Sequence, residues 1–154
     1  MKLFHSIIKA NKFDRAASVL SVLFLLAATV FLIVSWDAIP AEIAMGASGR
    51  TAGRKLLIFE TVIGWGLLLL LWGAEQLPSL WNFPVELTQE NTGRILRITK
   101  TMLNFLKLLL CLLFAVNIIS AAAGLSLPVW LIPCILLFLF GSMIFFIVRM
   151  FLAR

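Results

Sequence analysis

Four long apolar runs constrain the fold of this chain more than any other feature of its sequence. They cover about residues 16–35, 56–74, 101–123 and 128–148. A helix needs about 20 apolar residues to cross a bilayer, and each run is close to that length. The chain is 62% hydrophobic and 13% charged, whereas about 25% of the residues in a soluble domain are charged. We predict an all-α integral membrane protein, with residues 1–154 forming a single four-helix bundle.

The first run lies near the N-terminus, but it is longer than the apolar region of a typical signal peptide, and three more runs follow it. We interpret it as a retained span. The basic segment before it, residues 1–15, is compatible with a short helix on the membrane surface or with a partly ordered tail.

Positive charge is distributed unevenly between the two sides of the predicted bundle. Four spans put both termini on one side, together with the loop at 75–100. That side has ten Lys or Arg residues: Lys2, Lys9, Lys12, Arg15, Arg94, Arg97, Lys100, Lys107, Arg149 and Arg154. The other side, the loop at 36–55, has Arg50, Arg54 and Lys55. Cytoplasmic loops collect Lys and Arg, so we predict that both termini are cytoplasmic. The net charge of +6 is then explained without nucleic acid.

The third span is predicted to be longer than the bilayer requires. Thr88 is a suitable N-cap, and no helix breaker lies between Arg94 and Ala123. We expect the first three or four turns of this helix to extend into the cytoplasm.

Polar side chains enter the apolar runs at two places. Glu60 is either an interfacial acid that reaches headgroup water or pairs with Arg54, or a ligand or proton site facing the bundle. A polar strip on one helical face follows from spacings of three and four residues: Arg97, Lys100, Asn104, Lys107 and Cys111. The strip is either a solvated face whose last lysine reaches back to the headgroups, or a basic surface that faces the other helices and holds an anion, such as a lipid phosphate or Glu75. We consider Glu60, Asn104 and Lys107 a candidate intramembrane polar site.

The sequence contains no recognisable catalytic, cofactor or metal-binding arrangement. The single histidine, His5, lies in the tail, and Cys111 and Cys134 have no partner at metal-ligand spacing. Gly64 and Gly66 are predicted close-packing positions between helices. We therefore expect a protein that is not an enzyme and has no cofactor.

Short motifs in two loops resemble those of a known family. The first loop contains Ile39-Pro40-Ala41-Glu42-Ile43, then Ala47-Ser48-Gly49-Arg50, then Lys55; the second contains Pro84-Val85-Glu86-Leu87-Thr88-Gln89-Glu90-Asn91, then Arg94 and Lys107. Over about residues 36–119 this pattern resembles the SdpI-like small membrane proteins of bacteria, which carry a domain of unknown function.

The chain departs from the family pattern in the first loop. Ala44 replaces the second proline, Met45-Gly46 replaces the usual histidine, and Thr51-Ala52-Gly53 replaces the acidic residue after the glycine. A ligand that depends on that histidine or acid is therefore not implied. The residues that match the family motif are Pro40, Gly49, Lys55, Asn91 and Lys107.

The resemblance implies a multi-pass protein of the bacterial cytoplasmic (inner) membrane with a role in immunity to a secreted peptide toxin or in signalling. Its partners would be membrane lipids and a peptide or a membrane protein. Two other functions stay open from the residues alone. The chain is compatible with an accessory or structural subunit of a larger membrane complex, or with a small transporter or lipid-handling protein that uses Glu60 and Lys107.

Overall fold

The computed structural model describes residues 11–45 and 50–153. They form four α-helices, two short 3-10 helices and one two-stranded sheet. In chain order these are α2 (Lys12–Ser35), η1 (Trp36–Ala38), β1 (Glu42–Met45), β2 (Arg50–Gly53), α3 (Lys55–Gln76), η3 (Pro78–Leu80), α4 (Thr92–Ala122) and α5 (Leu131–Leu152). Each of the four α-helices is long and apolar enough to cross a membrane. The predicted all-α class with four apolar helices is confirmed.

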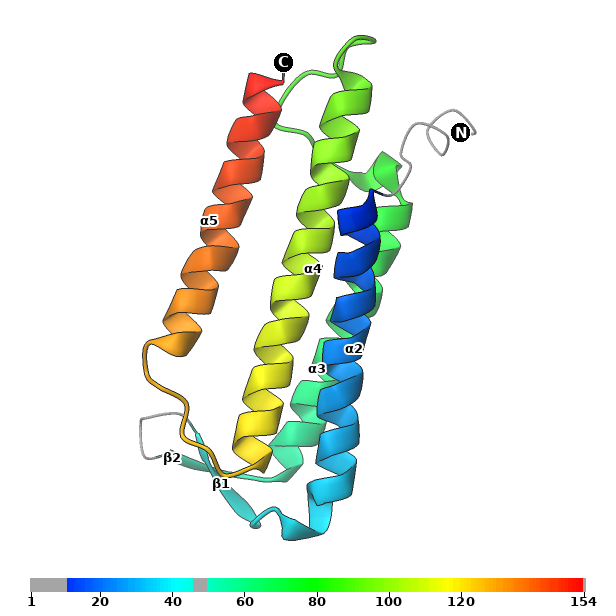
Figure 1. The fold of residues 1–154 in the computed structure, drawn as a ribbon. Coiled ribbons are helices and arrows are strands. Elements are labelled where there is room, and N and C mark those ends of the chain that lie inside the picture. Colours follow the sequence, from blue (N-terminus) through cyan, green and yellow to red (C-terminus); the bar gives the residue numbers. More distant parts are fainter. Residues whose placement is uncertain (1–10, 46–49, 154) are drawn as a thin grey trace.

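The helices form a bundle with α4 at its centre (Figure 1). α2 and α3 pack against α4 and against each other, whereas α5 packs mainly on α4. α2 begins and α5 ends at the same end of the bundle, which we call the terminal end. The β1–β2 hairpin lies at the opposite end, which we call the hairpin end (Figure 1). α2 and α4 therefore run in one direction and α3 and α5 in the other.

Small and apolar side chains on the inward face of α2 let it pack closely on α4. Ala17, Ser21, Leu25, Ala28 and Leu32 are all buried, and they recur at the three- and four-residue spacing of one helical face. Gly64 of α3 is also a close-packing position, because a Cβ placed there would lie 3.1 Å from Leu25 Cδ2. The same prediction for Gly66 is wrong, since a Cβ there meets no atom within 4 Å.

The loop between α2 and α3 forms a hairpin, which the sequence did not lead us to expect. Glu42 pairs with Gly53 and Met45 with Arg50 in an antiparallel register. Ile39 and Ile43 are buried against the apolar cluster that closes this end of the bundle. The hairpin therefore covers the end of the core. Burial of Ile39 and Ile43 in this cluster holds the hairpin in place.

The start of α4 differs from the prediction. The helix begins at Thr92 with Asn91 as its N-cap, so Thr88 is not the cap. Asn91 instead fixes the preceding turn, because its Oδ1 accepts from the Thr88 backbone N–H at 2.8 Å. Asn91 Nδ2 also donates to the Glu86 carbonyl at 3.1 Å.

The first turns of α4 are packed on one side. α4 has 31 residues and is therefore about 46 Å long at 1.5 Å per residue. Ile95 is fully buried in a cluster with Val85 of the preceding loop and Met150 of α5. Arg94 and Arg97 are exposed. These turns thus present their basic side to the surroundings and their apolar side to the protein.

Candidate functional site

A buried polar cluster crosses the interior of the bundle toward its terminal end. Its members come from three helices: Ser18 of α2, Glu75 of α3, and Lys100, Asn104 and Lys107 of α4. The last three belong to the polar strip of α4, and this part of the strip therefore faces α2 and α3, whereas Arg97 at its start is exposed.

Lys107 is the centre of this cluster and is only 1% exposed. Its Nζ lies 2.9 Å from Glu75 Oε2 and donates to Ser18 Oγ at 2.9 Å. Lys100 Nζ lies 3.6 Å from the other oxygen of Glu75, Oε1. Glu75 is therefore paired with two ammonium groups inside the protein, an arrangement that compensates for removing these charges from water.

Asn104 completes the cluster and has no exposed surface. Its Oδ1 accepts from Ser18 Oγ at 2.7 Å, and its Nδ2 donates to the Lys100 carbonyl at 3.0 Å. Asn104 also makes a side-chain hydrogen bond with Glu75. A buried amide whose hydrogen bonds are all formed stabilises the protein and fixes the relative orientation of neighbouring helices. The cluster is closed and internally satisfied, which is typical of a structural centre.

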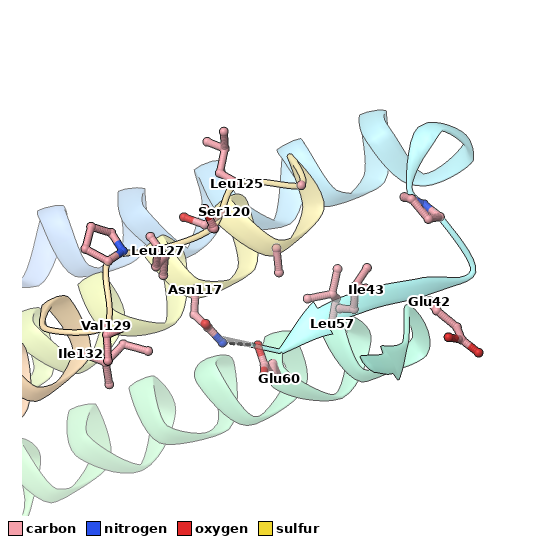
Figure 2. Close-up of a pocket in the computed structure, with 15 residues that line it drawn as sticks. Glu42, Ile43, Leu57, Glu60, Asn117, Ser120, Leu125, Leu127, Val129 and Ile132 are labelled. Atoms are coloured by element: carbon pink, nitrogen blue, oxygen red, sulfur yellow. Dashed lines mark hydrogen bonds between the residues drawn. The ribbon is translucent and has the colours of Figure 1, made fainter. Parts of the chain in front are cut away.

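A second polar centre lies in an open pocket at the hairpin end. This hairpin-end pocket has a volume of about 470 Å³ and lies between β1, α3, α4 and the segment that leads into α5 (Figure 2). Its lining consists of Pro40, Glu42, Ile43, Leu57, Glu60, Asn117, Ser120, Ala121, Gly124, Leu125, Ser126, Leu127, Pro128, Val129 and Ile132.

Glu60 and Asn117 form the polar wall of the pocket. Asn117 Nδ2 donates to Glu60 Oε2 at 2.9 Å, which joins α4 to α3 (Figure 2). Both side chains are partly exposed. Glu42 also lines the pocket, but its carboxylate points away from Glu60 (Figure 2). The pocket thus offers one carboxylate with a fixed orientation among apolar side chains.

Arg54 is engaged elsewhere and not with Glu60. Its Nη1 donates to the carbonyls of Trp36 and Ile39, each at 3.1 Å, and its guanidinium lies 4.8 Å from the centre of the Trp36 ring. Arg54 therefore ties the hairpin to the end of α2. Because it contacts these groups, it leaves the Glu60 carboxylate accessible from the pocket.

The structure divides the residues of the candidate polar site between the two centres. Asn104 and Lys107 lie together in the buried cluster, whereas Glu60 lies in the hairpin-end pocket. Sequence reasoning missed Ser18. A signal was present, because Asp14, Ser18 and Ser21 recur at spacings of four and three residues on the face of α2 that meets α4.

The residues of the family motif also have different surroundings. Pro40 lines the pocket, exposed Lys55 is the first residue of α3, and Asn91 holds the turn before α4. Lys107 is the centre of the buried cluster. Gly49 lies outside the described residues, as do Gly46, the tail before residue 11 and Arg154.

Comparisons with known proteins assign no family to this chain. The chain matches no protein-family model, no curated protein and no solved structure. In the part of the chain that the structure describes, no group of three or more His, Cys, Asp or Glu residues is arranged to hold a metal ion.

Proposed function

We propose that this chain is a non-enzymatic protein of the bacterial cytoplasmic membrane that binds a peptide partner at the hairpin-end pocket, in the manner of an immunity or signalling protein. Three features support the proposal. Four helices are apolar and long enough to span the membrane. The two loops resemble the motifs of the SdpI-like family. The pocket lies beside the first of those loops.

The proposed orientation places the terminal end in the cytoplasm and the hairpin end outside. Ten of the 13 Lys and Arg residues would then be cytoplasmic, as expected from the positive-inside rule. The exposed basic side of the first turns of α4 would extend into the cytoplasm. Labelling with a membrane-impermeant thiol reagent tests this in cells that carry Lys55→Cys or Arg94→Cys in a background without Cys111 and Cys134. Only Lys55→Cys should react.

The observation that carries the proposal is the Glu60 carboxylate, held by Asn117, in a pocket whose other lining residues are mostly apolar. A pocket lined by apolar groups with a few oriented polar groups is the usual form of a ligand site. Its volume accommodates one or two side chains rather than a whole peptide. Glu60 provides the negative charge, so the partner would place an amine or a guanidinium there, with an apolar neighbour against Val129 and Ile132.

A protection assay tests this function. The chain is expressed in a bacterium sensitive to the peptides that the producing organism secretes, and growth inhibition is measured. Wild-type chain should raise the inhibitory concentration of one cationic peptide. Glu60→Gln should reduce that protection about tenfold, because a hydrogen bond to a charged group contributes about 1.5–3 kcal/mol.

Glu90→Gln is the matched control, since Glu90 is an exposed glutamate at the terminal end. It should leave protection unchanged. Unchanged sensitivity with the wild-type chain across all peptides would exclude the immunity function. Protection that survives Glu60→Gln would exclude the pocket as the binding site.

A further inference from the structure

A groove with one basic end runs along α5 on the outside of the bundle. It has a volume of about 660 Å³ and is lined by residues of α2, α4 and α5, including Phe13, Phe105, Gly141, Ser142 and Arg149. The groove is separate from both the buried polar cluster and the hairpin-end pocket, with which it shares no residue.

The groove exists because α2 and α5 both pack on α4 and leave a space between them that small residues enlarge. Gly141 faces this space, and a Cβ placed there would meet no atom within 4 Å. The Phe105 ring lies at its base, 6.2 Å from the Phe13 ring, 5.9 Å from that of Phe138 and 6.0 Å from that of Phe146. The groove surface is therefore aromatic and apolar, which suits contact with a hydrocarbon chain.

Charge enters the groove at one end only. Among the described residues, Arg149 is the single charged member of its lining. Arg149 is exposed, and its guanidinium lies 5.9 Å from the centre of the Phe145 ring, which also lines the groove. One guanidinium group therefore lies at the terminal end of the groove, and the described lining contains no carboxylate to neutralise it.

The length of the groove matches one leaflet of a membrane. Its lining on α5 extends from Cys134 to Arg149, which corresponds to about 22 Å at 1.5 Å per residue. One leaflet with its headgroup region accounts for about half of a total bilayer thickness of about 40–45 Å. An acyl chain can thus lie along the aromatic surface while its headgroup reaches Arg149 near the end of α5.

We infer that this groove binds an anionic phospholipid, with an acyl chain beside Gly141 and the phosphate at Arg149. Basic pockets between transmembrane helices are known binding sites for anionic headgroups. Arginine suits a phosphate because its planar donors bind it in a bidentate manner. The inference does not depend on the proposed peptide partner or on which side of the membrane each end faces.

Native mass spectrometry tests this with the full chain purified in mild detergent. The chain is mixed with equal amounts of phosphatidylglycerol and phosphatidylcholine that have identical acyl chains. Wild-type chain should retain one phosphatidylglycerol preferentially. Arg149→Gln should reduce this preference about fivefold, the order expected for one basic residue near an anionic headgroup. Gly141→Leu fills the groove and should abolish retention of the lipid.

Two variants control for general effects. Gly66→Leu places the same side chain in open space on α3, and Lys55→Gln removes one exposed charge at the hairpin end; neither should change lipid retention. Melting temperatures of all variants in the same detergent establish that they are folded. Equal retention of the two lipids by the wild-type chain would overturn the inference, as would full phosphatidylglycerol retention by folded Gly141→Leu.

Discussion

The two glutamates of α3, Glu60 and Glu75, have opposite surroundings although they belong to one helix. They lie 15 residues apart in sequence, about 22 Å along the axis. Glu75 is buried and paired with two lysines. Among the described residues, Glu60 has one hydrogen-bond partner, the amide of Asn117, and it lies in the wall of a pocket.

We therefore interpret Glu75 as a residue that stabilises the bundle and Glu60 as the residue that contacts the ligand of the proposed function. A buried charge whose partners are all supplied by the protein holds helices together and has little capacity for a ligand. A carboxylate that is half satisfied and accessible can exchange a water molecule for a ligand atom. The comparison predicts that changes around Glu75 affect stability, whereas changes at Glu60 affect binding.

The largest expected effect is that of Lys107→Met. The substitution leaves the buried Glu75 with Lys100 as its remaining cation, and removing one partner of a buried ion pair costs about 3–5 kcal/mol. Unfolding in mixed micelles should show a loss near the lower end of that range. The double variant Glu75→Gln, Lys107→Met should recover most of it. A loss below about 1 kcal/mol for the single variant, the size typical of an exposed pair, would contradict the structural role of this one.

The next effect in size is that of Asn104→Leu. The leucine has a similar volume but leaves Ser18 Oγ without its acceptor and Glu75 without one donor, and an unsatisfied buried polar group costs about 1–3 kcal/mol. We expect a loss near the middle of that range in the same assay. Asn117→Leu, at the more open centre, should cost clearly less. Equal losses for the two variants would remove the distinction between the centres.

Thr29→Val probes the region between the two centres. Thr29 Oγ1 accepts from Trp65 Nε1 at 3.0 Å and donates to the Leu25 carbonyl at 2.7 Å. Hydrogen bonds between membrane helices contribute about 0.6 kcal/mol on average, so we expect a loss of that order. Thr92→Val is a suitable control, because its hydroxyl donates to the Thr88 carbonyl in the exposed turn before α4. A loss as large as that of Asn104→Leu would mean that the centres are energetically continuous.

The smallest stability effect should come from Glu60→Gln. The amide keeps an oxygen for Asn117 and removes only a partly exposed charge, so the free energy of unfolding should change by less than about 0.5 kcal/mol. The same variant should strongly reduce protection in the growth assay. Circular dichroism in detergent during heating gives the stability comparison. A large destabilisation would assign Glu60 to the structural class instead.

Much of the architecture was predictable because span length and hydropathy are local properties. The spacing of Lys100, Asn104 and Lys107 likewise places these residues on one face of α4 from the sequence alone. Periodicity does not indicate which neighbouring helix that face meets, however, so the partner of Lys107 stayed open between lipid, water and Glu75. Ser18, 89 residues away from Lys107 in sequence, becomes its neighbour only through the relative rotation of α2 and α4.

The hairpin and the pocket were less accessible to sequence reasoning for a different reason. The first loop is rich in glycine and polar residues, a composition typical of turns, and its strands have only four residues each. Their pairing depends on burying Ile39 and Ile43 over the end of the core. The pocket depends on where the segment after α4 passes, a question of tertiary packing that no local pattern determines.

The pairing of Glu75 with Lys107 also has a consequence for the synthesis of the protein. The two residues lie on consecutive helices joined by the loop at 77–91, and Lys107 stands midway along α4. A lysine within a span that inserts alone is costly, by up to about 2.5–3.5 kcal/mol at the bilayer centre on translocon scales. Entry of α3 and α4 into the bilayer as a hairpin neutralises that charge during insertion. Release of these two helices from the translocon is therefore expected to be coupled, with α2 already in place to receive Lys107 through Ser18.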